Sequence, residues 1–454
     1  MLLFVLALLA PRWLGPTSFG YFTTGLAFVG VFRVLPDFGM AYASTLAISR
    51  DRSLAERLTG GMLAFQAVLS VITLAACLLA GRRLYEGVAW AAVAILSVDL
   101  IFKSLKGTFR WVLKAQERFD VEAVSLLAER ALLLGLGVAV LASGRGVVAL
   151  CVVFAAVRLL EAVALAGYIH RRVLPLRPRY DPALWRDLLR KGLPYAYAGA
   201  MITLIFDVDA VLLEAMRGAT EVGFYRAPVQ VLGGLTLIPR VIGYAFIPTM
   251  AALHVSSPAT VSELYRRGSK YLLVAGLPIA AFGVLESPRF VQALFGSDYA
   301  PSAPAARFLL PAAVFMFLSN FGETTLACIN RWRSIVVVST LTLALNIGLN
   351  LLWIPRHGFL GSSWATLATE AAYFALGAAA LRAYGLRAAW FASAARALAA
   401  TAAFAATLWV GRGLPLLAVS MLASLVFVAA TFALGVWDEK ERALLAGWWR
   451  RATA

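Results

Sequence analysis

The stretch GPTSFGYFTTGLAFVGVFRVLPDFG, from Gly15 to Gly39, decides the fold class. It is almost wholly apolar and long enough for a helix that crosses the bilayer core, which needs about 20 residues. Even so, Arg33 and Asp37 lie inside it. Charged side chains are costly in hydrocarbon and normally face a cavity or a partner. The stretch therefore predicts a membrane helix whose two charges face something other than lipid.

Apolar runs of this kind recur along all 454 residues, of which 61% are hydrophobic and 14% charged, with a mean hydropathy of +0.80. Soluble domains average about 45–50% apolar and about 25% charged residues. We predict an all-α polytopic membrane protein with about fourteen transmembrane helices. The predicted spans are 1–14, 19–42, 59–80, 85–102, 121–142, 146–169, 192–215, 222–248, 270–287, 303–328, 334–355, 361–383, 390–410 and 414–436. The first is short for a bilayer, so we expect a start further upstream or an incomplete helix.

The net charge of +17 follows from topology, because most of the 41 Lys and Arg residues fall in alternate loops on one side. The positive-inside rule places that side, and with it both termini, in the cytoplasm. Two basic segments with interleaved aromatics, 103–118 and 171–191, are assigned to these loops. They either anchor the topology or lie in the interface and gather a lipid diphosphate. Nucleic acid is not expected as a partner.

The sequence contains no pattern typical of catalysis or metal binding. Its three Cys and three His residues lie far apart and match neither a metal-ligand nor a CxxC spacing. A phosphate loop, a GxSxG elbow and an HExxH pair are all absent. We predict no catalytic residue, no metal and no cofactor.

The opening stretch recurs 203 residues later as GATEVGFYRAPVQVLGGLTLIPR. The matches are Gly15 with Gly218, Thr17 with Thr220, Gly20 with Gly223, Gly30 with Gly233, Pro36 with Pro239, and the aromatic pair Tyr21–Phe22 with Phe224–Tyr225. A weaker echo, offset by 213, puts Arg118–Phe119 on Arg331–Trp332. The second and eighth spans correspond, and an even separation predicts two parallel lobes around a central cleft. The alternative is that Gly and Pro recur by chance, as they do in any membrane protein.

The repeat gives the domain boundaries. Residues 1–191 form an N-terminal lobe of helices 1–6, and residues 192–385 form a C-terminal lobe of helices 7–12. Residues 386–454 add helices 13 and 14 and a cytoplasmic tail.

Charges on the eighth span indicate what the cleft binds. Arg226, Gln230 and Arg240 fall close to one helical face, and the repeat maps this face onto the segment of Arg33 and Asp37. We predict these five residues as substrate-binding residues in a shared aqueous cleft. Their arginines suit an anion, since guanidinium matches phosphate oxygens bidentately. The alternative is that Arg33 and Asp37, spaced i, i+4, only neutralise each other.

Other carboxylates within the spans are candidates for ion coupling. Asp99, Glu323 and Glu370 have no basic neighbour on their own helix, and Asp207 and Asp209 point to different faces, so that at most one reaches the cleft. Asp99, Asp209, Glu323 and Glu370 could bind a coupling H+ or Na+, or be uncharged acids bonded between helices. For Arg158–Glu161 and Glu129–Arg130, local pairing and function stay equally open.

Nearly the whole chain resembles the polysaccharide-exporting flippases of the MOP superfamily, the Wzx-type O-antigen and exopolysaccharide exporters, whose relatives are the MATE exporters and MurJ. The stretches that carry the resemblance are LGPTSFGYF, PDFGM, KAQERF, GLPYAYAG, VDAVLLEAMRGATEVGFYRA, IPRVIGYAFIPTMAAL, LFGSDYAPSAPAARFLLPA and NRWRSIVVVSTLTLALNIGLNLLWIPRHGFLGSSWATLATE. It implies fourteen helices in two six-helix lobes and a bacterial inner-membrane location. It also implies export of a polyprenyl-diphosphate-linked glycan by alternating access, coupled to H+ or Na+, among membrane lipids and in contact with polysaccharide polymerase machinery. Two alternatives remain, a MATE-type cation-coupled drug exporter and a polytopic polysaccharide polymerase or ligase.

Overall fold

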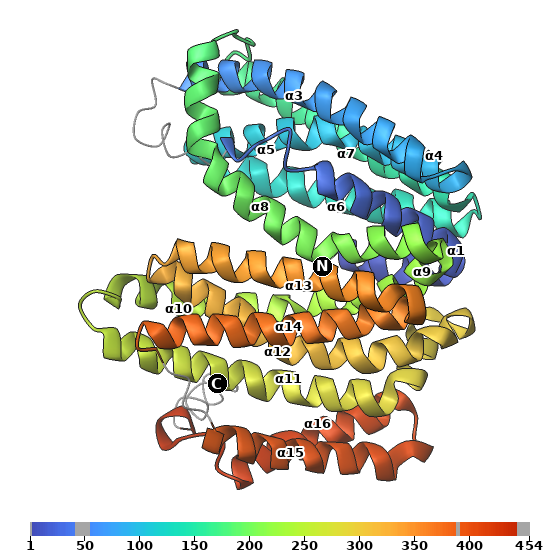
Figure 1. Ribbon diagram of the computed structural model, residues 1–454, viewed down its shortest axis with the longest axis vertical. Coiled ribbons are helices and arrows are strands. Elements are labelled where there is room, and N and C mark those ends of the chain that lie inside the picture. Colours follow the sequence, from blue (N-terminus) through green and yellow to red (C-terminus); the bar gives the residue numbers. More distant parts are fainter. Residues whose placement is uncertain (1, 41–54, 387–390, 443–454) are drawn as a thin grey trace. The chain divides into compact units, whose positions relative to one another are not determined.

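The computed structural model describes residues 2–40, 55–386 and 391–442, and all regular elements in these ranges are helices (Figure 1). They are α1 (Leu2–Phe32), α3 (Ala55–Leu84), α4 (Gly87–Ser97), α5 (Asp99–Ala115), α6 (Phe119–Ala142), α7 (Gly146–Arg172), α8 (Pro182–Arg217), α9 (Ala219–Leu235), α10 (Leu237–Leu253), α11 (Pro258–Phe295), α12 (Ala303–Cys328), α13 (Trp332–His357), α14 (Phe359–Ala383), α15 (Phe391–Val410) and α16 (Leu416–Ala433), with short 3₁₀ turns at Ser297–Ser302 and Gly411–Gly413. The all-α class is confirmed.

Eleven helical segments of the described ranges are long and apolar enough to cross a membrane. The chain is therefore a multi-pass membrane protein, and the count of fourteen spans stays a prediction. Parts of three sequence predictions lie outside the described residues: the end of the second span at 41–42, the start of the thirteenth at 390, and the tail beyond 442.

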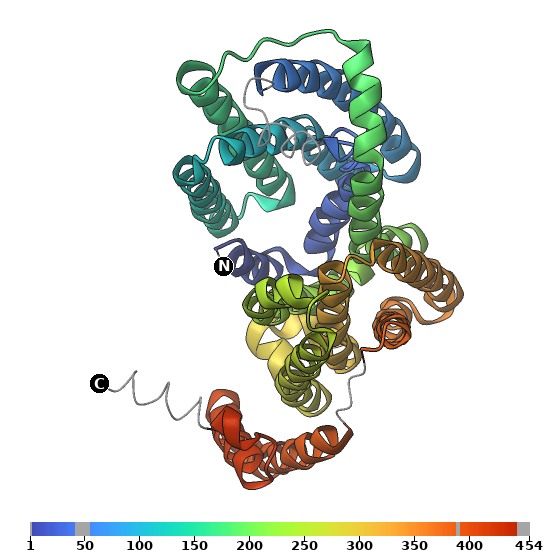
Figure 2. The same ribbon diagram turned by 90° about the vertical axis from the view of Figure 1, so that its left-hand side faces the viewer.

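The chain forms two compact units. The first contains residues 1–230 and 343–362, and the second contains 231–342 and 363–454. In the first unit α1 packs on α4, α6, α7 and α8, while α5 packs on α3 and α7. Figure 2 shows α3, α5, α6 and α7 nearly end-on. The lobe boundaries inferred from the repeat stay a prediction, and α8 runs through residues 191 and 192 without a break.

Helix α8 begins ten residues before the predicted span does. Pro182 occupies its first turn, where the missing N–H costs nothing, and the carboxylate of Asp181 accepts the N–H of Leu184. That hydrogen bond and the Arg57 guanidinium 2.8 Å away lower the pKa of Asp181. The predicted loop 171–191 is therefore wrong over its second half, because this cap starts the helix inside it.

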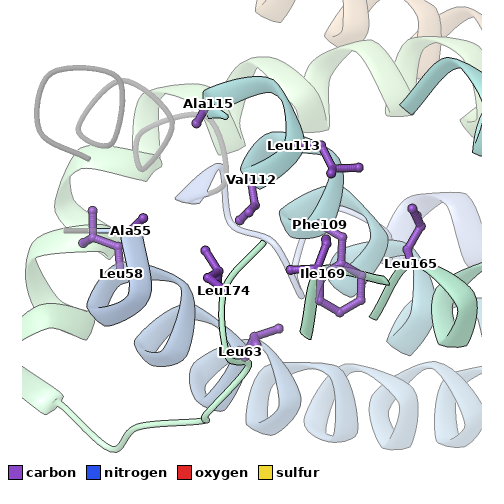
Figure 3. Packing of buried hydrophobic residues seen from close by; sticks show 10 residues of the cluster. All are labelled: Ala55, Leu58, Leu63, Phe109, Val112, Leu113, Ala115, Leu165, Ile169 and Leu174. Carbon is purple, nitrogen blue, oxygen red and sulfur yellow. The ribbon is translucent and has the colours of Figure 1, made fainter. Parts of the chain in front are cut away.

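The predicted loop 103–118 is also wrong over most of its length. Helix α5 extends to Ala115, so Lys103, Lys106 and Arg110 are helical rather than in a loop. Phe109 and other apolar residues of α5 pack with residues of α3, α7 and the segment after α7 in the cluster of Figure 3. This packing holds α5 among its neighbours, where carboxylates on α6 and α7 reach its cations.

The repeat-related helices α1 and α9 meet at equivalent residues within the first unit. Gly15 (φ 71°, ψ 169°) and Gly218 (φ 84°, ψ 172°) adopt the same conformation, which only glycine tolerates. Two residues later in each repeat, the hydroxyls of Thr17 and Thr220 lie 2.9 Å apart. A Cβ on Gly20 would come within 1.8 Å of the Ala219 carbonyl oxygen. Both the backbone geometry and this close contact support the repeat.

The same equivalence holds at two further places. Glu117 (φ 60°) and Asn330 (φ 59°), 213 residues apart, are both left-handed residues that end a helix, and the N–H of the following Arg bonds back into it. Helices α1 and α9 end at Phe32 and Leu235, four residues before Pro36 and Pro239. Proline cannot donate the N–H that the next helical turn needs.

These helix ends change two predictions. Arg33 to Gly39 form turns, with left-handed Phe38 and Gly39, so the predicted helix does not continue to residue 42. The predicted eighth span is divided at Thr236 into α9 and α10. Helical spacing therefore does not govern the position of Asp37 relative to Arg33, whereas Thr236, between Arg226 and Arg240, keeps helical dihedral angles (φ −60°, ψ −15°).

In the second unit α11 packs on α10, α12 and the hairpin of α15 and α16. The segment after α16 returns to α11, where buried Lys270 donates to Glu441 at 2.5 Å. Tyr271 donates to the other oxygen of Glu441 at 2.8 Å. These contacts fix the end of the hairpin to α11.

Candidate functional site

Two cations of α5 and two carboxylates form a closed charge network inside the first unit. Lys106 lies 3.2 Å from Glu129 of α6 and 2.8 Å from Glu161 of α7. Arg110 contacts the same carboxylates at 3.1 Å and 2.5 Å. Lys106, Glu129 and Glu161 are buried. Because each cation meets both acids, the network compensates its own charge and holds α5, α6 and α7 together.

A second ion pair joins α5 to α7 beside this network. Arg158 donates to Asp99, which is buried, and its Nε lies 3.9 Å from Glu129. Of the two interpretations left open for these residues, local pairing is not what the structure has for Arg158, Glu129 and Glu161, whose ion pairs are made between helices. The sequence prediction that Asp99 has no basic neighbour on its own helix is wrong, because α5 continues through Lys103, but the ion-pair partner of Asp99 lies on α7.

Arg33 and Lys103 supply positive charge that these pairs leave uncompensated. Arg33 lies within electrostatic range of Asp99, Arg158 and Asp207, and Lys103 lies within range of Arg33 and Asp99. Among the described residues, no carboxylate is within ion-pair distance of Arg33 or Lys103. The buried Nε of Arg33 has no hydrogen-bond partner there either.

Arg226 of α9 extends this positive region. It is buried and pairs with Asp207 of α8 at 2.9 Å, while its Nε has no hydrogen-bond partner among the described residues. Asp207 lies against Gly30 of α1, where a Cβ would come within 2.6 Å of its carboxylate oxygen. Asp207 thus pairs with Arg226 and lies within electrostatic range of Arg33. We call Arg33, Lys103 and Arg226 the basic site.

The other predicted substrate residues lie elsewhere. Asp37 accepts from Gln66 at 3.0 Å, and Gln66 in turn accepts from Thr108. Gln230 is half-buried at the end of the first unit, and Arg240 is exposed in the second. Sequence reasoning missed Lys103, since it was counted among loop cations. The signal available was its spacing from Lys106 and Arg110, at i+3 and i+7, which favours one helical face.

Asp209 forms a separate polar cluster in the first unit. This buried acid accepts from the Tyr225 hydroxyl at 2.6 Å and the Asn350 amide at 2.9 Å. Ser362 donates to the Asn350 carbonyl oxygen at 2.9 Å. The Asp209 carboxylate thus accepts from a hydroxyl and from an amide N–H, while the amide oxygen of Asn350 faces Ser362.

Two other predicted coupling residues lie in the second unit. Glu323 of α12 accepts from the Tyr373 hydroxyl at 2.7 Å, and Glu370 of α14 accepts from Ser319 at 3.4 Å. Both contacts bridge α12 and α14.

The comparisons with known proteins agree with this architecture. The lipid II flippase MurJ in an inward closed conformation superimposes with a TM-score of 0.78 at 9% identity, covering 95% of this chain and 96% of MurJ. An inward-facing multidrug resistance MATE transporter of the MOP superfamily gives a TM-score of 0.68 at 14% identity, covering 84% of this chain and 95% of that chain. The chain therefore shares the α-helical fold of these two transporters.

The family is shown by sequence. The model of the polysaccharide biosynthesis protein family matches residues 1–254, and the chain belongs to that family. A protein of Shigella flexneri named "Putative O-antigen transporter" is 26% identical over 162 residues, which are 34% of this chain and 38% of that protein. An uncharacterized membrane protein of Methanocaldococcus jannaschii is 23% identical over 225 residues, 45% of this chain and 42% of its own length. The chain thus spans less than half of the curated relatives that it matches.

Proposed function

We propose that this protein is a flippase that moves a polyprenyl-diphosphate-linked oligosaccharide across the bacterial inner membrane by alternating access. The observation that carries the proposal is the basic site, because its cations outnumber the nearby carboxylates. A diphosphate carries negative charge on both phosphates, and guanidinium binds such oxygens bidentately. The isoprenoid tail stays in lipid while the head group crosses, and both termini face the cytoplasm.

The residues of the basic site have distinct roles in this proposal. Arg33 and Lys103 bind the diphosphate or acidic sugars directly. Arg226 binds them when it exchanges Asp207 for a phosphate oxygen. Arg240, exposed on α10, offers a further cation during transport, and Asp37 and Gln230 contact the sugars. Membership of the polysaccharide biosynthesis protein family supports this substrate class.

Substitution of the basic site tests the flippase. We expect Arg226→Gln, Arg33→Gln and Lys103→Gln each to reduce surface polysaccharide at least tenfold in a strain that depends on this protein. Lipid-linked repeat units should then accumulate on the cytoplasmic side. Arg145→Gln, an exposed arginine between α6 and α7, is the matched control and should leave export unchanged.

A double variant separates substrate binding from support of the fold. Arg226→Gln leaves Asp207 without its ion-pair partner, so lower abundance alone could explain lost export. The double variant Arg226→Gln with Asp207→Asn removes both charges and should restore abundance without restoring export. Full export by the double variant would reduce Arg226 to a structural role and remove it from the site.

We further propose that Asp209 carries the coupling H+ or Na+. Asp209 is a buried carboxylate, and its cluster connects α8 and α9 to α13 and α14, so a change in its charge acts on several helices at once. Glu323 and Glu370 remain secondary candidates because each accepts from a hydroxyl between two helices. Asp99 becomes the least favoured, since Arg158 already holds its charge.

The alternatives make different predictions. A MATE-type exporter would expel dyes in cells that synthesise no lipid-linked glycan, whereas the proposed flippase has no such activity. A polymerase or ligase would transfer glycosyl groups when purified. Contact with polymerase machinery, if it forms, should be detectable by crosslinking in cells that make the polysaccharide.

A further inference from the structure

The second unit contains a pocket that the proposed transport does not use. Its volume is about 680 Å³, and it lies where the connections α10–α11 and α12–α13 meet the end of α14. Small-molecule sites typically measure about 300–1,000 Å³. The lining residues are His254, Val255, Pro258, Val261, Ile329, Asn330, Arg331, Ala383, Tyr384 and Leu386. None of them is acidic.

Arg331 is the main charge of this pocket. Its guanidinium stacks on the Tyr384 ring, 4.4 Å from the ring centroid, and the Tyr384 hydroxyl is held 3.0 Å from Ser334. Among the described residues no carboxylate pairs with Arg331. Stacking fixes the guanidinium plane and leaves its N–H groups available to a ligand.

The internal repeat shows that this charge is specific to the second unit. The counterpart of Arg331 in the first unit is Arg118, which follows the same left-handed turn. Arg118 makes two hydrogen bonds to Asp120, at 3.1 and 3.2 Å. At the position of Asp120 the second unit has Arg333. The acid that neutralises the first arginine is thus replaced by another cation.

His254 adds a second polar group to the pocket. Its Nδ1 lies 2.7 Å from the Ala251 carbonyl oxygen, which can only accept, so Nδ1 donates and Nε2 is left for other partners. Val255, Ile329 and Leu386 line the pocket with apolar surface. The pocket therefore combines a fixed guanidinium, an aromatic face and apolar walls.

We propose that this pocket binds a phosphate ester whose phosphate pairs with Arg331 and whose apolar or aromatic part packs against Tyr384 and the apolar walls. Phosphate matches the planar fork of arginine, and a positive pocket without acidic residues favours an anionic ligand. Such an ester comes either from the head group of an anionic phospholipid or from a soluble nucleotide. The site lies in the second unit and is separate from the basic site.

Two binding experiments on the full chain test the site and distinguish the two sources of the phosphate ester. The purified protein is placed in nanodiscs of phosphatidylcholine, and uridine diphosphate is added in a calorimeter. In a second arm the nanodiscs contain phosphatidylglycerol, and the lipid retained by the protein is counted by native mass spectrometry. Binding of uridine diphosphate indicates a soluble ligand, and retention of phosphatidylglycerol alone indicates a head group.

Matched variants assign the binding to Arg331. Arg331→Gln should lower the affinity for the bound probe, whichever of the two it is, by about tenfold or more, as expected for loss of a charge-assisted hydrogen bond. Arg333→Gln removes the same charge two residues away, outside the lining, and should bind as the wild type does. Tyr384→Leu keeps both arginines and should weaken binding several-fold through loss of the stack. The proposal is overturned if neither probe binds, if Arg331→Gln binds normally, or if Arg333→Gln loses as much.

Discussion

Single residues affect the stability of this chain at two kinds of position. One is where a helix packs against the backbone of another segment, and the other is where two charged side chains contact each other. Gly20 and Gly223 are of the first kind, since a Cβ would meet the Ala219 or the Pro16 carbonyl oxygen at 1.8 or 2.0 Å. Lys106 is of the second kind, because it is buried between two carboxylates. Substitution destabilises the two kinds of position for different reasons. At the glycines an added Cβ collides with backbone, whereas at a buried ion pair the loss of one charge leaves the other uncompensated.

Gly20→Ala should lower stability. The added methyl group would approach a carbonyl oxygen that belongs to backbone and cannot move aside, so α1 and α9 must separate. We expect a loss of about 1–3 kcal/mol, as for other overpacked sites, measured as a lower unfolding temperature in detergent. Gly135→Ala is the control, because a Cβ there meets nothing within 4 Å and should leave the unfolding temperature unchanged or raise it. Equal behaviour of the two variants would contradict the close crossing.

Lys106→Met should lower stability more. Arg110 would then be the one remaining cation that contacts both Glu129 and Glu161. Removing one partner of a buried ion pair costs about 3–5 kcal/mol. Adding Glu161→Gln to this variant should recover part of the loss, because one carboxylate charge then disappears. If the double variant is as unstable as the sum of both single changes, the network is not coupled as the distances imply.

At the level of elements, helix ends and their caps determine what each helix can contact. The α15–α16 hairpin is held to α11 by the segment that follows α16, in which Asp438 and Glu441 exchange backbone-to-carboxylate hydrogen bonds of 2.8 Å. The Glu441 N–H lowers the pKa of Asp438. This reciprocal cap presents the Glu441 carboxylate to Lys270, so a local turn fixes a long-range contact.

Lys270→Met should loosen the hairpin. Glu441 would be left buried with the Tyr271 hydroxyl and the Asp438 N–H as its remaining partners, at a cost of about 3–5 kcal/mol. The loss should appear as a lower unfolding temperature and faster proteolysis after α16. Lys440→Gln removes an exposed cation from the same segment and serves as the control. Similar proteolysis of both variants would show that the ion pair does not hold the hairpin.

At the level of the whole molecule, the proposed transport requires substrate binding to be connected with an ion gradient. The basic site and the Asp209 cluster both lie in the first unit. Helix α8 carries both Asp207, which pairs with Arg226 of the basic site, and Asp209, two residues further on. A change in the charge of Asp209 is therefore positioned to affect the helix that holds Arg226 in place.

Asp209→Asn should uncouple transport from the gradient. In proteoliposomes the variant should still bind lipid-linked glycan, while an imposed H+ or Na+ gradient no longer accelerates its translocation. Glu323→Gln, assayed in the same way, distinguishes coupling in the first unit from coupling in the second. Acceleration that persists in Asp209→Asn and disappears in Glu323→Gln would transfer the role to Glu323.

Much of the helical framework could be predicted from local sequence. Long apolar runs form helices, and glycine or proline ends them, through interactions within one segment. The repeat was visible for the same reason, since Gly15 and Gly218 need one backbone geometry that no other residue supplies. The site was predicted only in part. Arg33 and Arg226 were identified as charges inside spans, but the partners of Asp99, Glu129 and Glu161 lie 19 to 59 residues away in sequence.

The sequence by itself determined an all-α membrane protein with a repeated helix and charges at membrane depth, because hydropathy, helix breaking and charge are properties of short segments. Within the part of the chain that the structure describes, only the tertiary structure decided that Lys106 has carboxylates within ion-pair distance while Lys103 has none, and that Arg118 has an acidic partner while Arg331 has none. Whether a cation is neutralised depends on carboxylates brought to it by other helices or by a turn. Spacing along one helix carries no record of those neighbours.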